Sequence, residues 1–498
     1  MHSHLFSSTL VGVDARLVTV ESVVTSGLPG LTVVGLPDAA VSEAGARVRS
    51  ALKLSGISLP PRRMVVNLSP ADLRKSGGGF DLALALGLLE AIEEVPSGCL
   101  SDALVLGELS LDGRVRGVRG LVPSLGLASR HADVERILLP REQAATLPPW
   151  NGVDIVPVDT LSEAVEFCRS GRRPEPVECL VPENPSVGPD LSDVNGQSLA
   201  KLALEVSAAG GHHLALLGPP GCGKSLLASC LPGLLPPMTE IEQREVAAIA
   251  SVCQQEGAFQ VRPFRAPGVS LSAVALLGGY QPGEVTRAHR GVLFLDEFLE
   301  FRKDTLESLR LVLEEGEVKV ARARMQVTYP ARFTLVCAMN PCPCGMSGVT
   351  GEECVCSVPQ LNRYRSKLSG PLLDRFDLMV GLQRVALVDY VDESRRGEST
   401  AQVAERVRVA REVQQQRGSL NSELRTGRLF EALRWSDADR QLAYKIAENT
   451  KLSLRGFEKW LRVSRTLADL DGSEKVERRH LLTARSIRWG DSGLGIAA

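Results

Sequence analysis

Short apolar runs alternate with segments of helical periodicity in the first part of the chain. The runs LTVVGL (residues 31–36) and MVVNLS (residues 64–69) have the length and composition of strands. Residues 80–92 instead repeat their apolar positions with the spacing of a helix. This alternation predicts a small α/β domain.

A proline-rich stretch, residues 171–191, interrupts the pattern. It holds five prolines in 21 residues and follows neither the helix nor the strand period. We interpret it as a linker between an N-terminal domain (residues 1–170) and an α/β core (residues 192–400). From about residue 401 to 498 the pattern is helical, with AQVAERVRVAREVQQQR followed by segments around Ala443, Trp460 and Leu482. The chain therefore divides into two α/β domains and an all-helical C-terminal lid.

The core begins with an amphipathic segment, residues 198–209, and a four-residue apolar strand, residues 214–217. The next eight residues, GPPGCGKS, fit the phosphate-loop pattern G-x4-G-K-[ST], and a helical run, LLASCL, follows. Backbone N–H groups and a helix N-terminus there can surround phosphate oxygens, which predicts an ATP site. Lys224 would reach the β- and γ-phosphates, and the Ser225 hydroxyl would bind Mg²⁺. A glycine-rich structural turn is the alternative. The motif comprises Gly218, Pro219, Pro220, Gly221, Cys222, Gly223, Lys224 and Ser225.

Polar residues end two further apolar strands. VLFLDE places Asp296 and Glu297 after a buried run, and residues 333–340 end in Asn340. Asp296 would hold Mg²⁺ through water, while Glu297 would orient and deprotonate the water that attacks ATP. The Asn340 amide could position the same water. Taken alone, the acidic pair also fits a solvated strand end and the asparagine a turn, but the phosphate loop favours catalysis.

Four cysteines form two C-x-C pairs, Cys342 with Cys344 and Cys354 with Cys356. Glycines lie between the pairs and would let the loop fold back. Four thiolates suit structural, tetrahedral Zn²⁺, with no open position for catalysis. The usual spacing is C-x₂-C, so free thiols or a redox pair remain alternatives.

Residues 315–333, EGEVKVARARMQVTYPARF, have the alternation of a β-hairpin, with Lys319, Arg322 and Arg324 near its middle. Cations spaced along a loop can follow a nucleic-acid backbone without reading bases, so single-stranded or branched DNA is the expected partner. An exposed strand with alternating charge is the alternative. Arg262 and Arg265 in RPFRAP are second candidates for DNA contact.

Composition restricts these interpretations. Lys and Arg (57) nearly balance Asp and Glu (59), so any nucleic-acid contact must be local. The eleven cysteines are an odd number and are scattered, which favours reduced thiols over a disulfide framework. We find no signal-peptide pattern and no apolar run of about 18 residues, so we expect a cytoplasmic protein without a membrane span.

From residue 198 to 470 the chain resembles the magnesium-chelatase-like branch of AAA+ ATPases. The resemblance lies in LAKLALEVSAAGGHHLALLGPPGCGKS, RPFRAPGVSLSAVALLGG, HRGVLFLDEF and CAMNPCPCG. Nearly the whole chain is similar to the ComM/YifB group. This implies an AAA+ core and a homo-hexameric helicase that uses ATP to migrate branched DNA in natural transformation, with recombination proteins as further partners. A motor that remodels a protein partner, as in magnesium chelatase, is the alternative.

The resemblance also implies roles for three residues. Asn340 matches sensor 1, Arg375 in SGPLLDRFDL matches the arginine finger, and Arg455 in LSLRGFEKWLRVSRTLADL matches the sensor-2 arginine of the lid. A forked cation suits the negative charge that spreads during phosphoryl transfer. Since a finger of this class serves the neighbouring subunit, an isolated monomer should be inactive. For each arginine an ordinary surface ion pair is the alternative.

The N-terminal region resembles the Lon-protease-like domain that also occurs in the RadA recombination protein. The likeness lies in LRKSGGGFDLALALG and GELSLDGRVRGVRGL. Aligned on these segments, Gly79 stands where Lon proteases have their nucleophilic serine, and Val122 stands where they have the activating lysine. The resemblance therefore implies a ring scaffold or a DNA-binding scaffold without peptidase activity.

Overall fold

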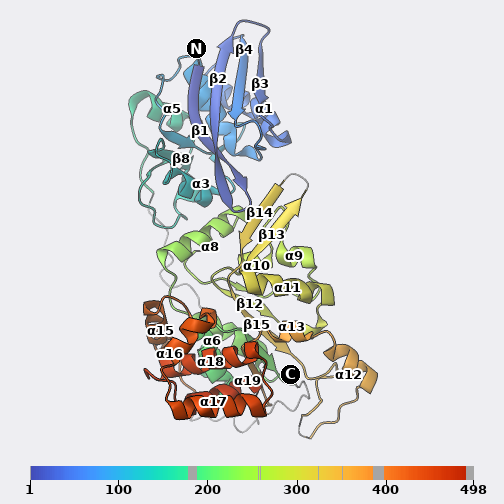
Figure 1. Cartoon of the computed structure of the whole chain (residues 1–498). Helices are drawn as coiled ribbons and strands as arrows, with labels where there is room; N and C mark the ends of the chain where they lie inside the picture. Colours follow the sequence, from blue (N-terminus) through green and yellow to red (C-terminus); the bar gives the residue numbers. More distant parts are fainter. Residues whose placement is uncertain are drawn as a thin grey trace.

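The computed structural model describes residues 2–177, 188–255, 257, 259–322, 325–349, 351–384 and 397–489 (Figure 1). An N-terminal sheet lies at one end of the molecule and a group of C-terminal helices at the other, with a parallel sheet between them. Within the described ranges, every helix is too short or too polar to span a membrane. The expected linker begins where α5 ends, at Ser170, and a 3₁₀ helix begins at Leu191. Its residues 178–187 lie outside the described residues.

A seven-stranded sheet in the order β3-β4-β2-β1-β5-β8-β9 forms the N-terminal part. The β1–β2 and β2–β4 pairs are antiparallel and the other pairs are parallel. Burial alternates along β4, as expected for a strand with one face on the core. The predicted strands at residues 31–36 and 64–69 are confirmed as β3 and β4, and the predicted helix as α2. The elements are β1 (His2–Val11), β2 (Asp14–Thr25), β3 (Gly30–Val34), α1 (Ala39–Leu54), β4 (Arg63–Ser69), α2 (Asp81–Ala91), β5 (Ala103–Val105), α3 (Leu121–Ala128), β8 (Arg136–Pro140), α4 (Arg141–Ala144), β9 (Asp154–Val158) and α5 (Leu161–Ser170), with β6 (Glu108–Leu109) and β7 (Val115–Arg116) as a separate pair.

The middle of the molecule is a five-stranded parallel sheet in the order β11-β12-β15-β10-β16. Every residue of β10, β12 and β15 is buried, because helices cover a parallel sheet of this kind on both faces. The three strands confirm the apolar runs that precede the predicted site residues. The elements are α6 (Ser198–Gly210), β10 (Leu214–Leu217), α7 (Lys224–Leu234), α8 (Glu240–Val252), β11 (Phe264–Arg265), α9 (Ala273–Leu277), α10 (Glu284–Arg287), β12 (Val292–Leu295), α11 (Lys303–Glu315), β15 (Thr334–Met339), α12 (Val358–Arg365), α13 (Gly370–Leu373) and β16 (Leu378–Gly381).

Two further features flank this sheet. The predicted hairpin is confirmed as an antiparallel pair, β13 (Glu317–Arg322) and β14 (Met325–Pro330). The C-terminal helices are α15 (Thr400–Gln416), α16 (Thr426–Leu433), α17 (Asp437–Asn449), α18 (Leu454–Leu470) and α19 (Arg478–Trp489). They share one apolar core with α6 and α7, and Trp460 is fully buried in it with its indole N–H donating to the Leu481 carbonyl at 3.0 Å.

The N-terminal sheet contacts the middle of the molecule at two places. Helix α3 packs against α8, and the Arg119 guanidinium donates to the Val252 carbonyl at 2.5 Å. The β1–β2 turn packs against β14 of the hairpin: a Cβ at Gly12 would lie 2.2 Å from a Val327 methyl. A side chain at position 12 would therefore push the hairpin away.

Candidate nucleotide site

The phosphate loop connects β10 to α7, as the motif predicts. It runs from Gly218 to Gly223, and α7 begins at Lys224. Gly221 and Gly223 have φ of 77° and 89°, a left-handed conformation that glycine adopts without steric cost. The free N–H groups and the positive end of the α7 dipole lie at the loop, so the local geometry fits a phosphate group.

The Lys224 ammonium is fixed at the loop by three hydrogen bonds. It donates to the carbonyls of Gly218 at 2.7 Å and Pro219 at 2.8 Å, and to Asn340 Oδ1 at 3.1 Å. Burial lowers the pKa of Lys224. The predicted phosphate-binding lysine and the predicted water-positioning asparagine are thus in direct contact, although 116 positions separate them in the sequence.

The acidic pair meets the phosphate loop across neighbouring strands. Because β10, β15 and β12 are adjacent and parallel, their carboxyl ends share one edge of the sheet. There the Ser225 hydroxyl donates to Asp296 Oδ2 at 2.6 Å. Glu297 follows with a φ of 49° and an exposed side chain, and its N–H donates to Asp296 Oδ1 at 2.9 Å. The hydroxyl and carboxylate are the oxygen ligands that Mg²⁺ prefers, so this pair fits the ion.

Arg375 and Arg455 lie at the opposite edge of the same sheet. Arg375 precedes β16, and the N–H of Asp377 donates to the carbonyl of His213, which precedes β10. This is the amino end of the strands, whereas the phosphate loop follows their carboxyl ends. Arg375 Nη2 contacts Glu314 Oε2 at 2.6 Å, and Arg455 Nη2 lies 3.5 Å from Glu314 Oε1. The two predicted arginines are therefore brought together by one carboxylate.

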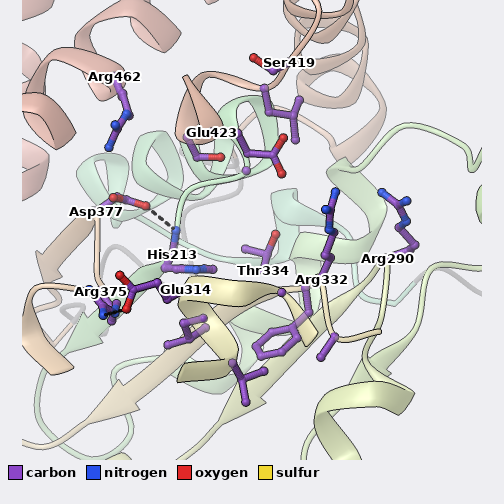
Figure 2. A pocket seen from close by; sticks show the side chains of 18 of the residues that line it. His213, Arg290, Glu314, Arg332, Thr334, Arg375, Asp377, Ser419, Glu423 and Arg462 are labelled. Atoms are coloured by element: carbon purple, nitrogen blue, oxygen red, sulfur yellow. Dashed lines mark hydrogen bonds and ion pairs between the residues drawn. The ribbon is translucent and has the colours of Figure 1, made fainter. Parts of the chain in front are cut away.

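Figure 2 shows the cavity at this edge, which has a volume of about 1060 Å³. Arginines come into it from the sheet region and from the C-terminal helices, among them Arg332, Arg375 and Arg462. Burial lowers the pKa of His213 to about 4, so this histidine adds no charge near neutral pH. Ten arginine and lysine side chains and six carboxylates line the cavity, so its lining has a net positive charge and comes from both parts of the chain.

A buried ion pair joins the Arg375 segment to the C-terminal helices. Asp377 contacts Lys459 of α18 at 3.0 Å, and its carbonyl accepts from Arg488 of α19 at 2.9 Å. Burial alone would raise the pKa of Asp377, but Lys459 and His212 outweigh it and hold the pKa well below its ordinary value. This anchoring fixes the position of α18, and hence of Arg455, relative to Arg375.

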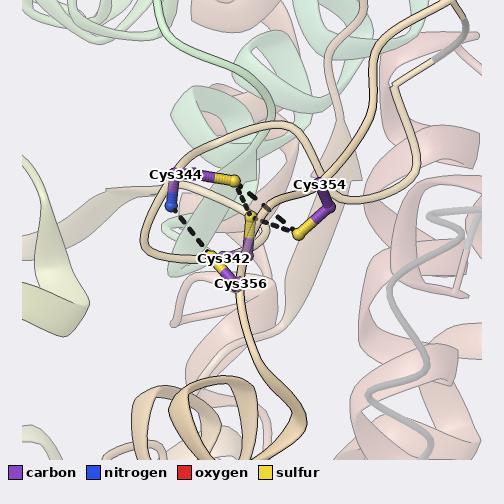
Figure 3. A group of neighbouring side chains, drawn as sticks. All are labelled: Cys342, Cys344, Cys354 and Cys356. Carbon is purple, nitrogen blue, oxygen red and sulfur yellow. Dashed lines mark hydrogen bonds between the residues drawn. The ribbon is translucent and has the colours of Figure 1, made fainter.

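The four cysteines lie together in the loop after Asn340 (Figure 3). Their Sγ atoms are all within 4.8 Å of one another, and three of the distances are 3.3, 3.6 and 3.6 Å. Tetrahedral zinc with Zn–S bonds of about 2.3 Å would set its sulfurs about 3.8 Å apart, so the cluster fits the ion. Gly345, Gly348 and Gly351 have φ of 81°, 76° and 81° and allow the loop to fold back.

This loop also contacts the phosphate loop. A Cβ at Gly345 would lie 2.5 Å from Pro220 Cδ, so the two backbones approach closely. A zinc ion held by the cysteines would therefore stabilise the phosphate loop from outside the nucleotide site. The spacing of the cysteines does not predict this contact.

The candidate DNA contacts differ in their surroundings. Lys319 is half-exposed on β13 and pairs with Glu315 at 2.9 Å and Glu317 at 3.0 Å. Arg322 ends β13, but its side chain and the whole of Arg324 lie outside the described residues.

The second candidates are both held by partners within the chain. The Arg262 side chain is 9% exposed and donates to the carbonyls of Pro236 at 2.8 Å and Arg290 at 2.7 Å. Arg265 forms a bidentate pair with Glu284 at 2.7 and 3.0 Å. A phosphate at Arg262 would have to replace buried hydrogen bonds, so its surroundings favour a structural role.

Both positions that correspond to the Lon catalytic pair are in packed surroundings. Gly79 lies in a 3₁₀ helix, where a Cβ would contact Val118 at 3.5 Å. Val122 is 6% exposed, and its N–H donates to Ser251 Oγ of α8 at 3.3 Å. The surface around Val122 thus holds the N-terminal part against α8.

Sequence reasoning missed Glu314. It stands in the acidic run LEEGEV, which has no motif, and its contact with Arg375 spans 61 positions. Only the tertiary structure identifies it as the shared partner of both arginines.

Three family models match the chain. The one described as magnesium chelatase, subunit ChlI, matches residues 190–389. Subunit ChlI of Mg-chelatase matches residues 20–143, and the C-terminal model of the same subunit matches residues 397–488. The phosphate loop, the acidic pair and Arg375 all fall within the first match.

Relatives match over almost the full length. The chain is 40% identical over 497 residues to the competence protein ComM of Haemophilus influenzae, with 97% of each chain covered. It is 40% identical over 488 residues to the uncharacterized protein YifB of Escherichia coli, covering 96% of this chain and 95% of that protein. A Lon protease of Brucella abortus is 31% identical over 200 residues, which are 38% of this chain and 24% of the protease. The chain therefore belongs to the ComM/YifB group of magnesium-chelatase-like AAA+ ATPases, with a Lon-like N-terminal part.

Proposed function

We propose that this chain is the subunit of an ATP-hydrolysing homo-hexameric ring motor that acts on DNA and migrates branched recombination intermediates. The phosphate loop binds ATP, with Lys224 on the β- and γ-phosphates. Mg²⁺, held by Ser225 and Asp296, would neutralise charge on the phosphate oxygens. Glu297 accepts the proton of the attacking water, and Asn340, fixed by its contact with Lys224, orients that water.

We infer the ring from one observation, which is the distance between the two arginines and the phosphate loop of the same chain. Arg375 stands at the amino end of β16 and the loop at the carboxyl end of β10. A four-residue strand separates its ends by about 13 Å. Arg375 and Arg455 therefore serve the ATP of the neighbouring subunit. Each subunit gives its arginines to one neighbour and receives a pair from the other, and such head-to-tail contacts close into a ring. A ring of six is what the AAA+ likeness implies.

Two features support DNA as the substrate. The hairpin carries Lys319, Arg322 and Arg324, which can follow a phosphate backbone without reading bases. The relative in Haemophilus influenzae is called a competence protein, and the ComM/YifB likeness implies migration of branched DNA. Recombination proteins are then the further partners we expect. None of the ten described cysteines forms a disulfide, which suits the reducing cytoplasm, where we propose that the motor works.

The test is the ATPase rate of the purified ring with and without single-stranded and four-way branched DNA, together with strand exchange on a labelled junction. We expect DNA to stimulate turnover and the junction to migrate only with ATP and an intact Glu297. An ATPase that neither DNA accelerates, and that leaves the junction unmoved, would contradict the DNA assignment.

A second candidate is a motor that remodels a protein partner, and the descriptions of the family models favour it because they name magnesium chelatase. It shares the ATP site and the ring. It predicts that DNA leaves the ATPase rate unchanged, so the same experiment separates the two functions.

A further inference from the structure

Glu314 lies between Arg375 and Arg455, the two arginines that serve a neighbouring subunit's ATP in the proposed ring. It lies in the last turn of α11, and its two carboxylate oxygens face different partners. Oε2 contacts Arg375 at 2.6 Å (Figure 2), and Oε1 lies 3.5 Å from Arg455. One carboxylate thus bridges two guanidinium groups from the sheet and from the lid. Two oxygens of a γ-phosphate would offer the same pair of acceptors.

The surroundings of the arginines favour exchange of this partner. The Arg375 side chain is 11% exposed, and its buried Nε has no hydrogen-bond partner among the described residues. Arg455 is half-exposed, and Glu314 is the carboxylate with which it pairs. A guanidinium has five N–H donors and the contact with Glu314 engages only Nη2, so Arg375 can also bind a more highly charged anion. Glu314 itself is half-exposed, so water can receive its side chain when it leaves.

We propose that Glu314 is a positioning residue that holds Arg375 and Arg455 as a pair until the γ-phosphate of the neighbouring subunit's ATP displaces it. The proposal rests on the proposed function, because it requires the arginines to act between subunits. Displacement follows from charge: a carboxylate and a γ-phosphate repel each other and cannot share the same two cations at close range.

The position of Glu314 also connects this exchange to the hairpin. Helix α11 ends at Glu315, Gly316 caps it in a left-handed conformation, and β13 begins at Glu317. The residue after Glu314, Glu315, pairs with Lys319 of the hairpin at 2.9 Å. Release of Glu314 therefore frees the last turn of the helix from which the hairpin starts. DNA on the hairpin and ATP in the neighbouring subunit would act on the same turn from its two sides.

The test is Glu314→Gln, which keeps the shape of the side chain but removes the charge that competes with phosphate. We expect ATPase without DNA to rise about three- to tenfold, the range expected for loss of one or two partly exposed ion pairs. Stimulation by DNA should fall by the same factor, since the contact that DNA helps to break is already absent. Glu314→Asp keeps the charge and should remain near the wild-type rate.

Controls separate this effect from damage to the fold. Glu307→Gln changes the same residue type on α11 and removes only its pair with Arg310, so it should leave the basal rate unchanged. Removing a negative charge from a helix C-terminus favours the helix dipole, so Glu314→Gln should keep its melting temperature. The double variant Glu314→Gln with Arg375→Ala should be as inactive as Arg375→Ala alone.

A basal rate for Glu314→Gln equal to or below that of Glu307→Gln overturns the role of Glu314. The proposed function has its own readout, since mixed Arg375→Ala and Lys224→Ala subunits must regain activity if the arginines act between subunits. Rescue in the mixture together with an unchanged Glu314→Gln rate would refute only the role of Glu314. Full activity of Arg375→Ala alone would refute both.

Discussion

At the carboxyl-end edge of the parallel sheet the predicted site residues contact one another directly, whereas at the amino-end edge the two predicted arginines share one carboxylate beside a cavity. At the first edge Lys224 contacts Asn340 at 3.1 Å and Ser225 contacts Asp296 at 2.6 Å. At the amino-end edge, arginines are among the residues that line a cavity of about 1060 Å³. The exposed carboxylate of Glu314 lies between two of these arginines, Arg375 and Arg455. This difference is what we expect if, as proposed, one edge binds and activates ATP and the other receives the phosphate of a neighbouring subunit.

The strongest test of this difference replaces a predicted site residue at one edge at a time. Arg375→Ala should bind ATP with near-normal affinity but hydrolyse it about 10³-fold more slowly, the lower range for loss of an arginine finger. Lys224→Ala should be inactive because the phosphate grip is lost. Mixing the two should restore part of the activity, because some interfaces then pair an intact phosphate loop with an intact finger. Steady-state ATPase of the mixture measures the rescue.

Dilution provides the control for that experiment. If the site is shared between subunits, wild-type ATPase per chain must fall as rings dissociate, whereas a finger acting within its own chain makes the rate independent of concentration. A mixture that stays inactive, with a wild-type rate that does not change on dilution, would mean that both edges serve the same nucleotide.

A second change tests the division of labour within the carboxyl-end edge. Glu297→Gln should retain ATP binding and lower turnover by about 10²- to 10⁴-fold, the usual contribution of a general base. Lys224→Ala should instead lose nucleotide affinity. Equilibrium binding of a fluorescent ATP analogue and single-turnover hydrolysis measure the two effects separately. Glu300→Gln, an exposed acid on the same 3₁₀ turn, is the matched control; near-normal turnover in Glu297→Gln would assign the base elsewhere.

The two edges also differ in how well the sequence predicts them. The predicted residues of the carboxyl-end edge directly follow a strand or begin a helix: Asp296 and Asn340 follow β12 and β15, and Lys224 and Ser225 begin α7. Adjacent parallel strands bring these ends together, so local patterns predict this edge. The amino-end edge depends on side chains whose partners are far away in the sequence. Glu314 reaches Arg375 across 61 positions, and no periodicity encodes that pairing.

The same reason explains the weaker predictions. The RPFRAP segment suggests a DNA contact for Arg262 because the sequence displays its charge but not its burial. In the structure, the main-chain carbonyls of Pro236 and Arg290 accept hydrogen bonds from the Arg262 guanidinium. Strand order could likewise not be predicted: length and composition predict β4, but pairing of β1 with both β2 and β5 is a tertiary outcome.

Metal removal should weaken the carboxyl-end edge without destroying it. We expect about one zinc per chain under reducing, chelator-free conditions, lost in the double variant Cys354→Ser with Cys356→Ser. Because the cysteine loop packs on Pro220 through Gly345, the variant should raise KM for ATP about two- to tenfold, or about 0.4–1.4 kcal/mol. Cys253→Ser, outside the cluster, should change neither value. Elemental analysis that finds no zinc in the wild type would contradict the zinc assignment.

The smallest effect concerns the hairpin, which leaves the amino-end edge of the sheet through α11 and Gly316 and carries the proposed DNA cations. Replacing Lys319, Arg322 and Arg324 together with alanine should weaken binding to single-stranded DNA and reduce the slope of log affinity against log salt by about 2, since each phosphate contact contributes about 0.7. Basal ATPase should largely survive, because the two hairpin strands form a separate sheet from the one whose carboxyl-end edge forms the nucleotide site. Fluorescence anisotropy at several salt concentrations measures the slope.

The single variants should not contribute equally to that slope. Lys319 already shares its charge with Glu315 at 2.9 Å and Glu317 at 3.0 Å, so it displaces fewer counterions from DNA than an unpaired cation would. Lys319→Ala should therefore change the slope by less than about 0.7, with the larger share coming from the two arginines. Arg265→Ala serves as the matched control because Glu284 holds that guanidinium in a bidentate pair, and its slope should equal that of the wild type. If the triple variant keeps the wild-type slope and Arg265→Ala lowers it, DNA binds at the RPFRAP segment. The hairpin would then respond to the exchange of Glu314 for phosphate at the amino-end edge without contacting the DNA backbone.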